Sequence, residues 1–500
     1  MQELPLIARA QSHGHRIAVR AGDREYTYAE LLDASAAVAA ALLGAGKDLA
    51  EACIAFLAPG GFEYLAIQWG IWRAGGVVVP LSVSATKSEL EHALGDSGAS
   101  HVVVLRAHAE KLESLPGESD RQLLIFEDIA LTANCLLPEI DPTRRAMILF
   151  TSGTTSTPKG VVTTHENIRA QIESLVEAWE WENSDCIPLF LPMHHIHGII
   201  NIACCALWAG ATVECFPKFE AGRILGRVGA GAYTLFMAVP TIYVVLIDLL
   251  ESQRYTGEVR ERILSGFANM RLMVSGSAAL PSTVHEKWTA LTGQSLLERY
   301  GMTETGMNLS NPLHGERRPG AVGKPLPLVE VRRKSESGDL ITVEGEPGEI
   351  QVRGPVVFRE YWNRPEATSE AFDDGWFRTG DVAVLENGYY RIMGRMSIDI
   401  IKSGGYKLSA LEIESVLLNH PAIRECAVVG VKDDTWSELV GVVAVLKDGA
   451  SDLSIEDLRA WCKEWLSPYK VPRRLLVVDD LPRNAMGKVT KTVLADTFGR

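Results

Sequence analysis

The chain has 500 residues, of which 47% are hydrophobic and 22% are charged. Its 49 basic and 63 acidic residues give a formal net charge of −14 at pH 7. This length and apolar content suffice for a large buried core and favour two or more domains. The acidic balance argues against a general nucleic-acid or anionic-membrane surface, so anionic ligands must be met by local positive groups.

Eight cysteines are scattered without a C-x-x-C pair, which is typical of reduced thiols and not of a zinc site or a disulfide framework. The N-terminus has no apolar segment behind a basic one, so the sequence predicts no secretory signal and a cytoplasmic location. The longest apolar runs, residues 199–216 and 235–250, contain polar residues and are interpreted as buried elements. We therefore expect no integral membrane segment. The sequence does not indicate an oligomeric state.

The first 390 residues alternate short apolar runs with helical patterns. Helices are predicted at 27–43, with Thr27 as the N-cap, and at 61–74. This alternation predicts parallel sheets covered by helices. The predicted strands are residues 52–57, 76–80, 100–105, 122–126 and 272–275.

The pattern changes in the last third of the chain. Short alternating strands at 349–353 and 389–393 predict a β-rich subdomain. Beyond residue 395, the expected order of helix, two strands and helix predicts a compact α+β unit. We therefore predict an α/β fold with a large N-terminal domain, residues 1–395, and a small mobile C-terminal domain, residues 396–500. The elements expected in the small domain are helices at 410–418 and 455–466 and strands at 425–431 and 440–446.

A turn rich in hydroxyls and glycines follows two apolar strand residues in the segment LFTSGTTSTPKG, residues 149–160. Six Ser or Thr hydroxyls, exposed backbone N–H groups and the Lys159 ammonium are typical of a phosphate cradle. The segment is not a Walker A motif, because Pro158 precedes the lysine and Gly160 follows it. The sequence predicts triphosphate binding at this loop.

Four further motifs follow in chain order: VSGSAALP at 274–281, ERYGMTETG at 298–306, GWFRTGD at 375–381, and GR at 394–395 with PRNAMGK at 482–488. With the first loop, they resemble the adenylate-forming superfamily of acyl-CoA synthetases, luciferases and peptide-synthetase adenylation domains. The resemblance runs over nearly the whole chain. Within the superfamily, VPTIY at 239–243, ERYGMTE at 298–304 and RRPGAVG at 317–323 are most similar to malonyl-CoA synthetases and their mitochondrial relatives.

The resemblance implies an AMP-forming carboxylate–CoA ligase that uses ATP, Mg²⁺ and coenzyme A. A carboxylate is a poor acylating agent, and its linkage to AMP creates a mixed anhydride that a thiol can attack. A divalent metal and fixed cations lower the repulsion among the anions and stabilise charge on the α-phosphate.

The resemblance also implies roles for individual residues. Glu304 is the implied Mg²⁺ ligand, with Thr303 donating a hydroxyl to the phosphate beside it. Lys488 is implied to contact the substrate carboxylate and the α-phosphate during adenylation. Asp381 is implied to accept both ribose hydroxyls. The residues implied for ATP and AMP are Thr151, Ser152, Gly153, Thr154, Thr155, Lys159, Gly276, Ser277, Tyr300, Asp381 and Arg395.

In the superfamily the small domain swings after adenylation and brings a Gly-Gly turn to the thiol. Here that turn is Gly404-Gly405, where the absence of side chains would allow a pantetheine arm to pass closely. The pivot is expected between Arg395 and Asp399, in a segment that is one residue longer than in some relatives.

The acyl pocket is expected at PMHHIHG, residues 192–198, where His195 or His197 would hydrogen-bond a polar substrate. Three histidines in four positions could suggest a metal, but no second ligand cluster supports one. Arg317 stands where malonate-activating relatives also carry an arginine, which would pair with a second substrate carboxylate. Those relatives often place Arg or Lys after the tyrosine of VPT-x-Y, and here Val244-Val245 follow.

Malonate or methylmalonate is therefore the preferred acid, and a short or medium-chain fatty acid is the alternative. A further alternative is an adenylation domain that loads a carrier protein. Such domains usually hold the substrate ammonium with an Asp near PMHHIHG, and no acid occurs between Pro192 and Trp208. A luciferase-type monooxygenase is possible on fold alone. The expected partners are a small carboxylic acid, ATP and CoA.

Overall fold

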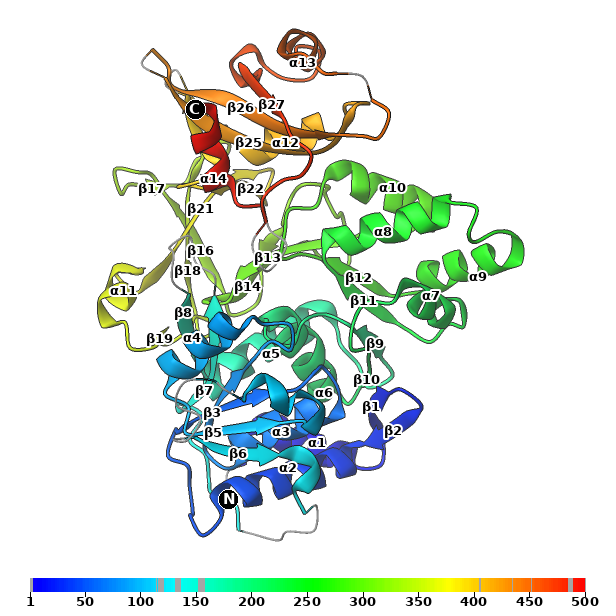
Figure 1. Cartoon of the computed structure of the whole chain (residues 1–500), viewed down its shortest axis with the longest axis vertical. Helices are drawn as coiled ribbons and strands as arrows, with labels where there is room; N and C mark the ends of the chain where they lie inside the picture. Colours follow the sequence, from blue (N-terminus) through cyan, green and yellow to red (C-terminus); the bar gives the residue numbers. More distant parts are fainter. Residues whose placement is uncertain are drawn as a thin grey trace.

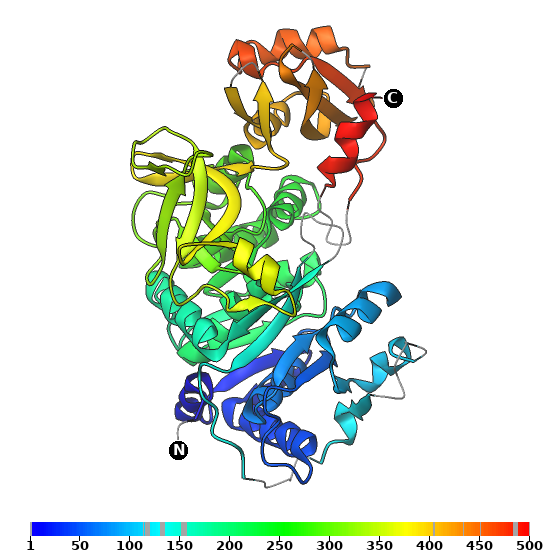
Figure 2. The same cartoon turned by 90° about the vertical axis from the view of Figure 1, so that its left-hand side faces the viewer.

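The computed structural model describes residues 3–113, 115, 121–130, 136–151, 158–403, 406–433, 435–450, 452–483 and 489–499. In Figure 1 the chain rises from the N-terminus at the bottom to a separate C-terminal unit at the top. Figure 2, turned by 90°, places the strand-rich subdomain on one side below that unit.

One sheet has the strand order β19-β8-β7-β4-β3-β5-β6. Strands β7, β4, β3, β5 and β6 run parallel, whereas β8 and β19 pair antiparallel at one edge. The bounds are β3 Cys53–Leu57, β4 Val77–Pro80, β5 His101–Val104, β6 Gln122–Ile125, β7 Arg145–Thr151, β8 Lys159–Thr164 and β19 Glu360–Tyr361.

Two further sheets contain parallel strands, in the orders β2-β1-β10-β9 and β11-β12-β13-β14-β15. In the second of these, β12 and β13 are parallel neighbours, so the segments after them lie at the same edge. Their bounds are β1 Ile17–Ala21, β2 Arg24–Thr27, β9 Cys186–Leu189, β10 Thr212–Cys215, β11 Leu235–Ala238, β12 Leu272–Ser275, β13 Leu297–Met302, β14 Gly306–Ser310 and β15 Lys324–Pro325.

Helices cover these sheets, as Figure 1 shows. Helix α2 begins with a capping box in which Thr27 and Glu30 each satisfy the other's backbone N–H. Gly70 allows α3 to approach α2, because a Cβ there would lie 2.5 Å from Val38. The helices of this region are α1 Pro5–His13, α2 Tyr28–Leu43, α3 Phe62–Arg73, α4 Lys87–Ser97, α5 His165–Trp179, α6 Cys205–Ala209, α7 Ala221–Gly229, α8 Pro240–Glu251, α9 Gly257–Ala268 and α10 Ser282–Thr292.

The subdomain that follows is an antiparallel sheet of order β17-β16-β18-β21-β20, with β22 paired to β21. It places Asp381 opposite Arg395 across β21 and β22. Its elements are β16 Glu330–Lys334, β17 Leu340–Ile341, β18 Gly348–Arg353, α11 Pro365–Glu370, β20 Phe372–Asp373, β21 Trp376–Glu386 and β22 Tyr389–Arg395.

The C-terminal unit has its own sheet, of order β24-β23-β26-β25 with β27 beside β26, and its own core. Its elements are β23 Ile400–Ser403, β24 Tyr406–Ser409, α12 Ala410–Leu417, β25 Ile423–Asp433, β26 Ser437–Leu446, α13 Ile455–Cys462, β27 Arg474–Val477 and α14 Lys491–Ala495.

The predicted α/β class is confirmed, with parallel sheets, a β-rich subdomain and a small α+β unit. The placement of the domain boundary at residues 395/396 stays a prediction. The apolar run 199–216 forms buried elements: most of a π-helix at His197–Cys204, then α6 and β10. None of the helices in the described ranges combines the length and apolar character that a membrane crossing requires.

Candidate active site

The described part of the first motif lies at the end of β7 and the start of β8. Thr151 pairs with Lys159 in the register, and the Thr151 hydroxyl donates to the Lys159 carbonyl at 3.4 Å. Strand β7 is parallel to β4, so Thr151 at its end lies at the carboxyl edge of a parallel sheet, where such folds bind ligands. The predicted residues Ser152, Gly153, Thr154 and Thr155 lie outside the described residues.

Lys159 and Glu304 both contact the side chain of Tyr361. Lys159 Nζ lies 5.0 Å from the centre of the Tyr361 ring, and the Tyr361 hydroxyl donates to Glu304 Oε1 at 3.0 Å. Strand β19 brings Tyr361 to this position by pairing it with Val161 of β8. The structure therefore brings the predicted phosphate-binding lysine and the predicted metal ligand into contact with the same tyrosine, the first at its ring and the second at its hydroxyl.

Glu304 fits a role as a magnesium ligand. Its side chain is buried, and burial raises the pKa of its carboxyl. In the described part of the chain it has no ion-pair partner, and no cluster of three or more His, Cys, Asp or Glu residues could hold a metal ion. Mg²⁺ is usually bound through one or two carboxylates together with substrate phosphates. A single buried carboxylate that shares Tyr361 with Lys159 matches that pattern.

Asp381 is held by two neighbouring side chains. The Tyr300 hydroxyl donates to Oδ2 at 2.5 Å, and Arg395 Nε donates to Oδ1 at 3.0 Å. The carboxylate thus has a fixed orientation, and each oxygen retains a lone pair for a ribose hydroxyl. Tyr300, one of the residues implied to bind ATP or AMP, uses its hydroxyl to position Asp381. The ribose and nucleotide roles themselves stay predictions.

A buried arginine that was not predicted as a site residue lies on β13, next to Tyr300. Arg299 is 4% exposed, and burial lowers the pKa of its guanidinium to about 9. Its Nη2 donates to Ser277 Oγ at 3.2 Å, while its Nε is buried without a hydrogen-bond partner in the described structure. Gly276 permits this position, because a Cβ there would lie 2.6 Å from Arg299 Cζ.

His197 completes this group. Its Nδ1 lies 3.2 Å from Ser277 Oγ, and its Nε2 is buried without a partner among the described residues. Burial lowers the pKa of His197 well below its ordinary value, so the ring is neutral at pH 7. We call Arg299, Ser277 and His197 the buried polar group. Ser277 and His197 were predicted site residues, and the signal that could have found Arg299 is its charge at the buried start of a strand.

Arg317 has a different environment from the one expected. Its guanidinium donates to the backbone carbonyls of Pro312 at 3.2 Å, Ser295 at 2.6 Å and Leu313 at 2.9 Å. These bonds tie down the loop before Gly320. Its role as a carboxylate ligand stays a prediction, but its contacts do not favour it. Tyr243, from VPTIY, is fully buried and donates to the Val274 carbonyl at 2.8 Å.

The remaining predicted residues are only partly placed. Thr303 is half-buried just before Glu304, and His195 lies with its ring 4.2 Å from that of His194. Lys488, Gly404 and Gly405 lie outside the described residues. Lys402 and Lys407, on either side of the Gly-Gly turn, both contact Glu336 of the subdomain, at 3.1 Å and 3.3 Å.

The expected pivot carries a buried ionic cluster. Asp399 Oδ2 accepts the backbone N–H of Arg395 at 3.0 Å, and Asp399 Oδ1 contacts Lys491 Nζ at 2.6 Å. Lys491 also contacts Glu414 of α12 at 2.7 Å. The segment 395–399 is thereby fixed to α14, the helix that follows the predicted catalytic lysine.

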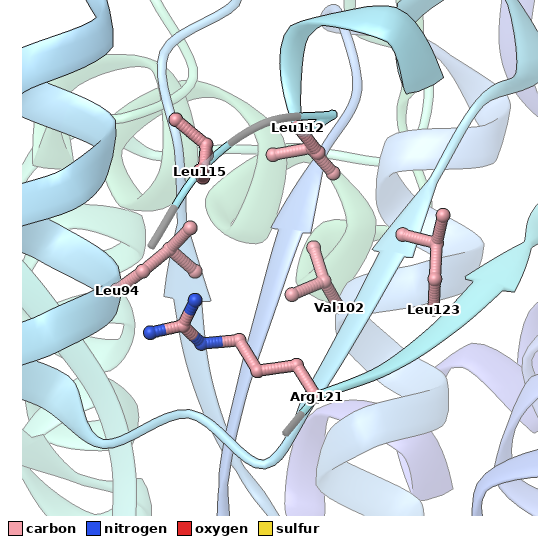
Figure 3. Close-up of a pocket in the computed structure, with 6 residues that line it drawn as sticks. All are labelled: Leu94, Val102, Leu112, Leu115, Arg121 and Leu123. Carbon is pink, nitrogen blue, oxygen red and sulfur yellow. The ribbon is translucent and has the colours of Figure 1, made fainter. Parts of the chain in front are cut away.

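Two cavities lie away from these motifs. A cavity of about 30 Å³ between α4 and β5–β6, drawn in Figure 3, is lined by aliphatic side chains and Arg121, and it is too small for a nucleotide. A wider hollow of about 590 Å³ lies beside the β1–β2 turn and α7. Two of its arginines, Arg20 and Arg227, are paired with Glu25 and Glu214. Neither cavity contains a motif residue.

The comparisons with known proteins agree with this arrangement. Residues 6–362 match the family model described as AMP-binding enzyme, and residues 412–488 match the model described as AMP-binding enzyme C-terminal domain. The chain belongs to the AMP-binding enzyme family. The predicted resemblance to the adenylate-forming superfamily is confirmed.

Similar proteins include curated relatives and a solved structure. The chain is 44% identical to mouse malonate–CoA ligase ACSF3, mitochondrial, over 98% of this chain and 90% of that protein. It is 39% identical to a malonate–CoA ligase of Arabidopsis thaliana, over 98% of this chain and 87% of that protein. The crystal structure of ATP-bound MatB from Rhodopseudomonas palustris superposes with a TM-score of 0.89 and 34% identity, covering 99% of each chain.

Proposed function

We propose that this protein is an AMP-forming malonate–CoA ligase, which converts malonate, ATP and CoA to malonyl-CoA, AMP and pyrophosphate. The observation that carries the proposal is the buried guanidinium of Arg299, which has no carboxylate partner in the described chain. The 39–44% identity to malonate–CoA ligases from a plant and from the mouse supports the same acid.

The energetics of Arg299 favour a substrate with a second carboxylate. An isolated buried cation is strongly unfavourable, which is why burial lowers its pKa. The far carboxylate of malonate would supply the missing counter-charge and could form two parallel N–H···O bonds. The methyl end of a fatty acid would leave the guanidinium unpaired, so the pocket should discriminate strongly between the two.

The neighbours of Arg299 add to this selectivity. The Ser277 hydroxyl accepts from Arg299, so its own proton is available for His197 Nδ1. This assigns the proton of the neutral imidazole to Nε2, which is buried without a partner among the described residues. The Nε2–H group would then donate to the same carboxylate. A guanidinium and an imidazole N–H thus form a preorganised site for an anion.

The other residues of the site would hold the nucleotide. Asp381, oriented by Tyr300 and Arg395, would accept the ribose hydroxyls, and Lys159 would place positive charge beside the phosphates. Mg²⁺ bound at Glu304 would neutralise charge on the triphosphate. With malonate and ATP held in this way, the near carboxylate of malonate attacks the α-phosphorus and pyrophosphate leaves. The CoA thiol then attacks the acyl carbon and AMP leaves.

The test compares acids in wild type and in Arg299→Met. CoA-dependent AMP release is measured with malonate and with butyrate. The variant should lose about a hundredfold to several thousandfold in kcat/KM for malonate, which corresponds to the ~3–5 kcal/mol of a broken buried ion pair. Butyrate turnover should be unchanged or improved. Equal loss for both acids would mean that Arg299 supports the fold and does not select the acid, and would favour the fatty-acid alternative.

The expected cytoplasmic location stays part of this proposal. The mouse relative is named as mitochondrial, and a mitochondrial location is the alternative. Fractionation of the native cells with a marker enzyme for each compartment would test the location directly.

A further inference from the structure

Tyr361 lies in a short strand that is far in sequence from the residues it contacts. Strand β19 forms the edge of a sheet next to β8, with Tyr361 opposite Val161. Just before it, the backbone N–H of Phe358 donates to the carbonyl of Glu304 at 2.7 Å. The Tyr361 N–H donates to Thr368 Oγ1 at 3.0 Å. The segment is thus fixed on one side to the Glu304 backbone and on the other to helix α11.

The side chain of Tyr361 contacts two groups of opposite charge. Its hydroxyl donates to Glu304 Oε1 at 3.0 Å, and the Lys159 ammonium lies 5.0 Å from its ring centre. The ring also packs edge-on against Phe358, with 4.8 Å between the ring centres. Packing against Phe358 therefore holds the ring in place. The hydroxyl contacts Glu304, and the face of the ring contacts Lys159.

This placement keeps both charges available for a ligand. A hydroxyl that donates to one carboxylate oxygen fixes the carboxylate but leaves its charge and its second oxygen unused. A cation above an aromatic ring is attracted without being neutralised by a counter-charge. In the described part of the chain, Lys159 and Glu304 form no direct ion pair, which would have cancelled both charges.

We propose that Tyr361 is a positioning residue that orients Glu304 toward Mg²⁺ and Lys159 toward the phosphates of ATP. The inference rests on the proposed function, because that function makes Glu304 the metal ligand. Groups that hydrogen-bond a metal ligand from behind are worth roughly tenfold to a hundredfold in metal affinity. Removing the hydroxyl of Tyr361 should therefore reduce the gain in ATP affinity that Mg²⁺ causes. Removing the ring as well should also reduce the metal-free ATP affinity.

The experiment measures ATP binding by titration calorimetry, with excess Mg²⁺ and with EDTA, on the full chain and without a carboxylic acid. In Tyr361→Phe, the gain in ATP affinity caused by Mg²⁺ should fall about tenfold to a hundredfold. Metal-free ATP affinity should stay within about twofold, because the ring below Lys159 remains. In Tyr361→Leu, metal-free affinity should fall as well, by several-fold.

The matched control is Tyr389→Phe, which removes a tyrosine hydroxyl that donates to the Glu316 carbonyl at 3.0 Å. It should leave both affinities unchanged. A Tyr361→Phe variant with the full magnesium effect would overturn the proposal. Since no acid is present, a wrong assignment of malonate would leave these results unaltered, and the two claims can fail separately.

Discussion

Replacing Lys491 by methionine should destabilise the C-terminal unit, because Lys491 joins two carboxylates that are largely shielded from solvent. Its Nζ lies 2.6 Å from Asp399 Oδ1 and 2.7 Å from Glu414 Oε1. The three side chains are only 11–16% exposed. Methionine would fill much of the volume of the lysine but would supply no charge.

The expected loss follows from the geometry of the cluster. Removing one member of a buried ion pair costs about 3–5 kcal/mol, because the other charge stays buried and uncompensated. Each carboxylate keeps one backbone N–H donor, from Arg395 for Asp399 and from Val428 for Glu414. We therefore expect a loss near the lower end of this range, about 3 kcal/mol.

The loss should depend on pH. Burial raises the pKa of Glu414 above its ordinary value, and the charge of Lys491 lowers it in part. A raised folded-state pKa gives stability that is present at low pH and is lost as the pH rises through that pKa. Without Lys491 the pKa of Glu414 rises further. The variant should therefore be destabilised more at about pH 8 than at about pH 5.

Urea denaturation followed by tryptophan fluorescence measures this effect, since Trp461 and Trp465 lie in or next to α13 of the C-terminal unit. The matched control is Lys463→Met at an exposed position, which should change the free energy of unfolding by less than about 0.5 kcal/mol. A loss below about 1 kcal/mol in Lys491→Met, or one that is equal at both pH values, would refute the reasoning.

Three further predictions concern the nucleotide and acyl sites. Burial raises the pKa of Glu298 to about 8, so the stability that its protonated form provides is lost as the pH rises toward that value. Glu298→Gln should therefore raise the melting temperature at pH 8 but not at pH 5. Equal shifts of the melting temperature at both pH values would contradict this. Gly276→Ala should displace Arg299 and lower kcat/KM for malonate by about a hundredfold, whereas an unchanged value would show that the guanidinium can move aside. Lys488→Ala should abolish pyrophosphate exchange but leave thioester formation from supplied malonyl-AMP intact, and equal loss of both steps would remove its predicted role.

Local sequence patterns predicted helices and strands well where residues close in the chain determine them. The run 272–275 coincides with β12, and the helix predicted at 27–43 with Thr27 as its cap forms α2 with a capping box. These signals depend on neighbours within one or two turns of the chain. The helix expected at 455–466 ends at Cys462, because the chain there turns toward Pro468.

Contacts between distant segments were not predictable in the same way. The chain alone gives no sign that Tyr361 pairs with Val161 and so reaches Glu304. Arg317 and Arg299 are both arginines in family motifs, and only the fold shows that the first bonds backbone carbonyls while the second lies buried beside Ser277. The partners of a charged side chain are set by tertiary packing, which motif spacing does not encode.

Substrate choice by the wild-type enzyme decides whether malonate is its acid. The measurement is kcat/KM for CoA-dependent AMP release with malonate, methylmalonate, butyrate and octanoate under identical conditions. The account predicts that malonate exceeds butyrate and octanoate by about a hundredfold or more, because each monocarboxylate leaves Arg299 unpaired. Turnover of butyrate or octanoate that equals or exceeds that of malonate would contradict it.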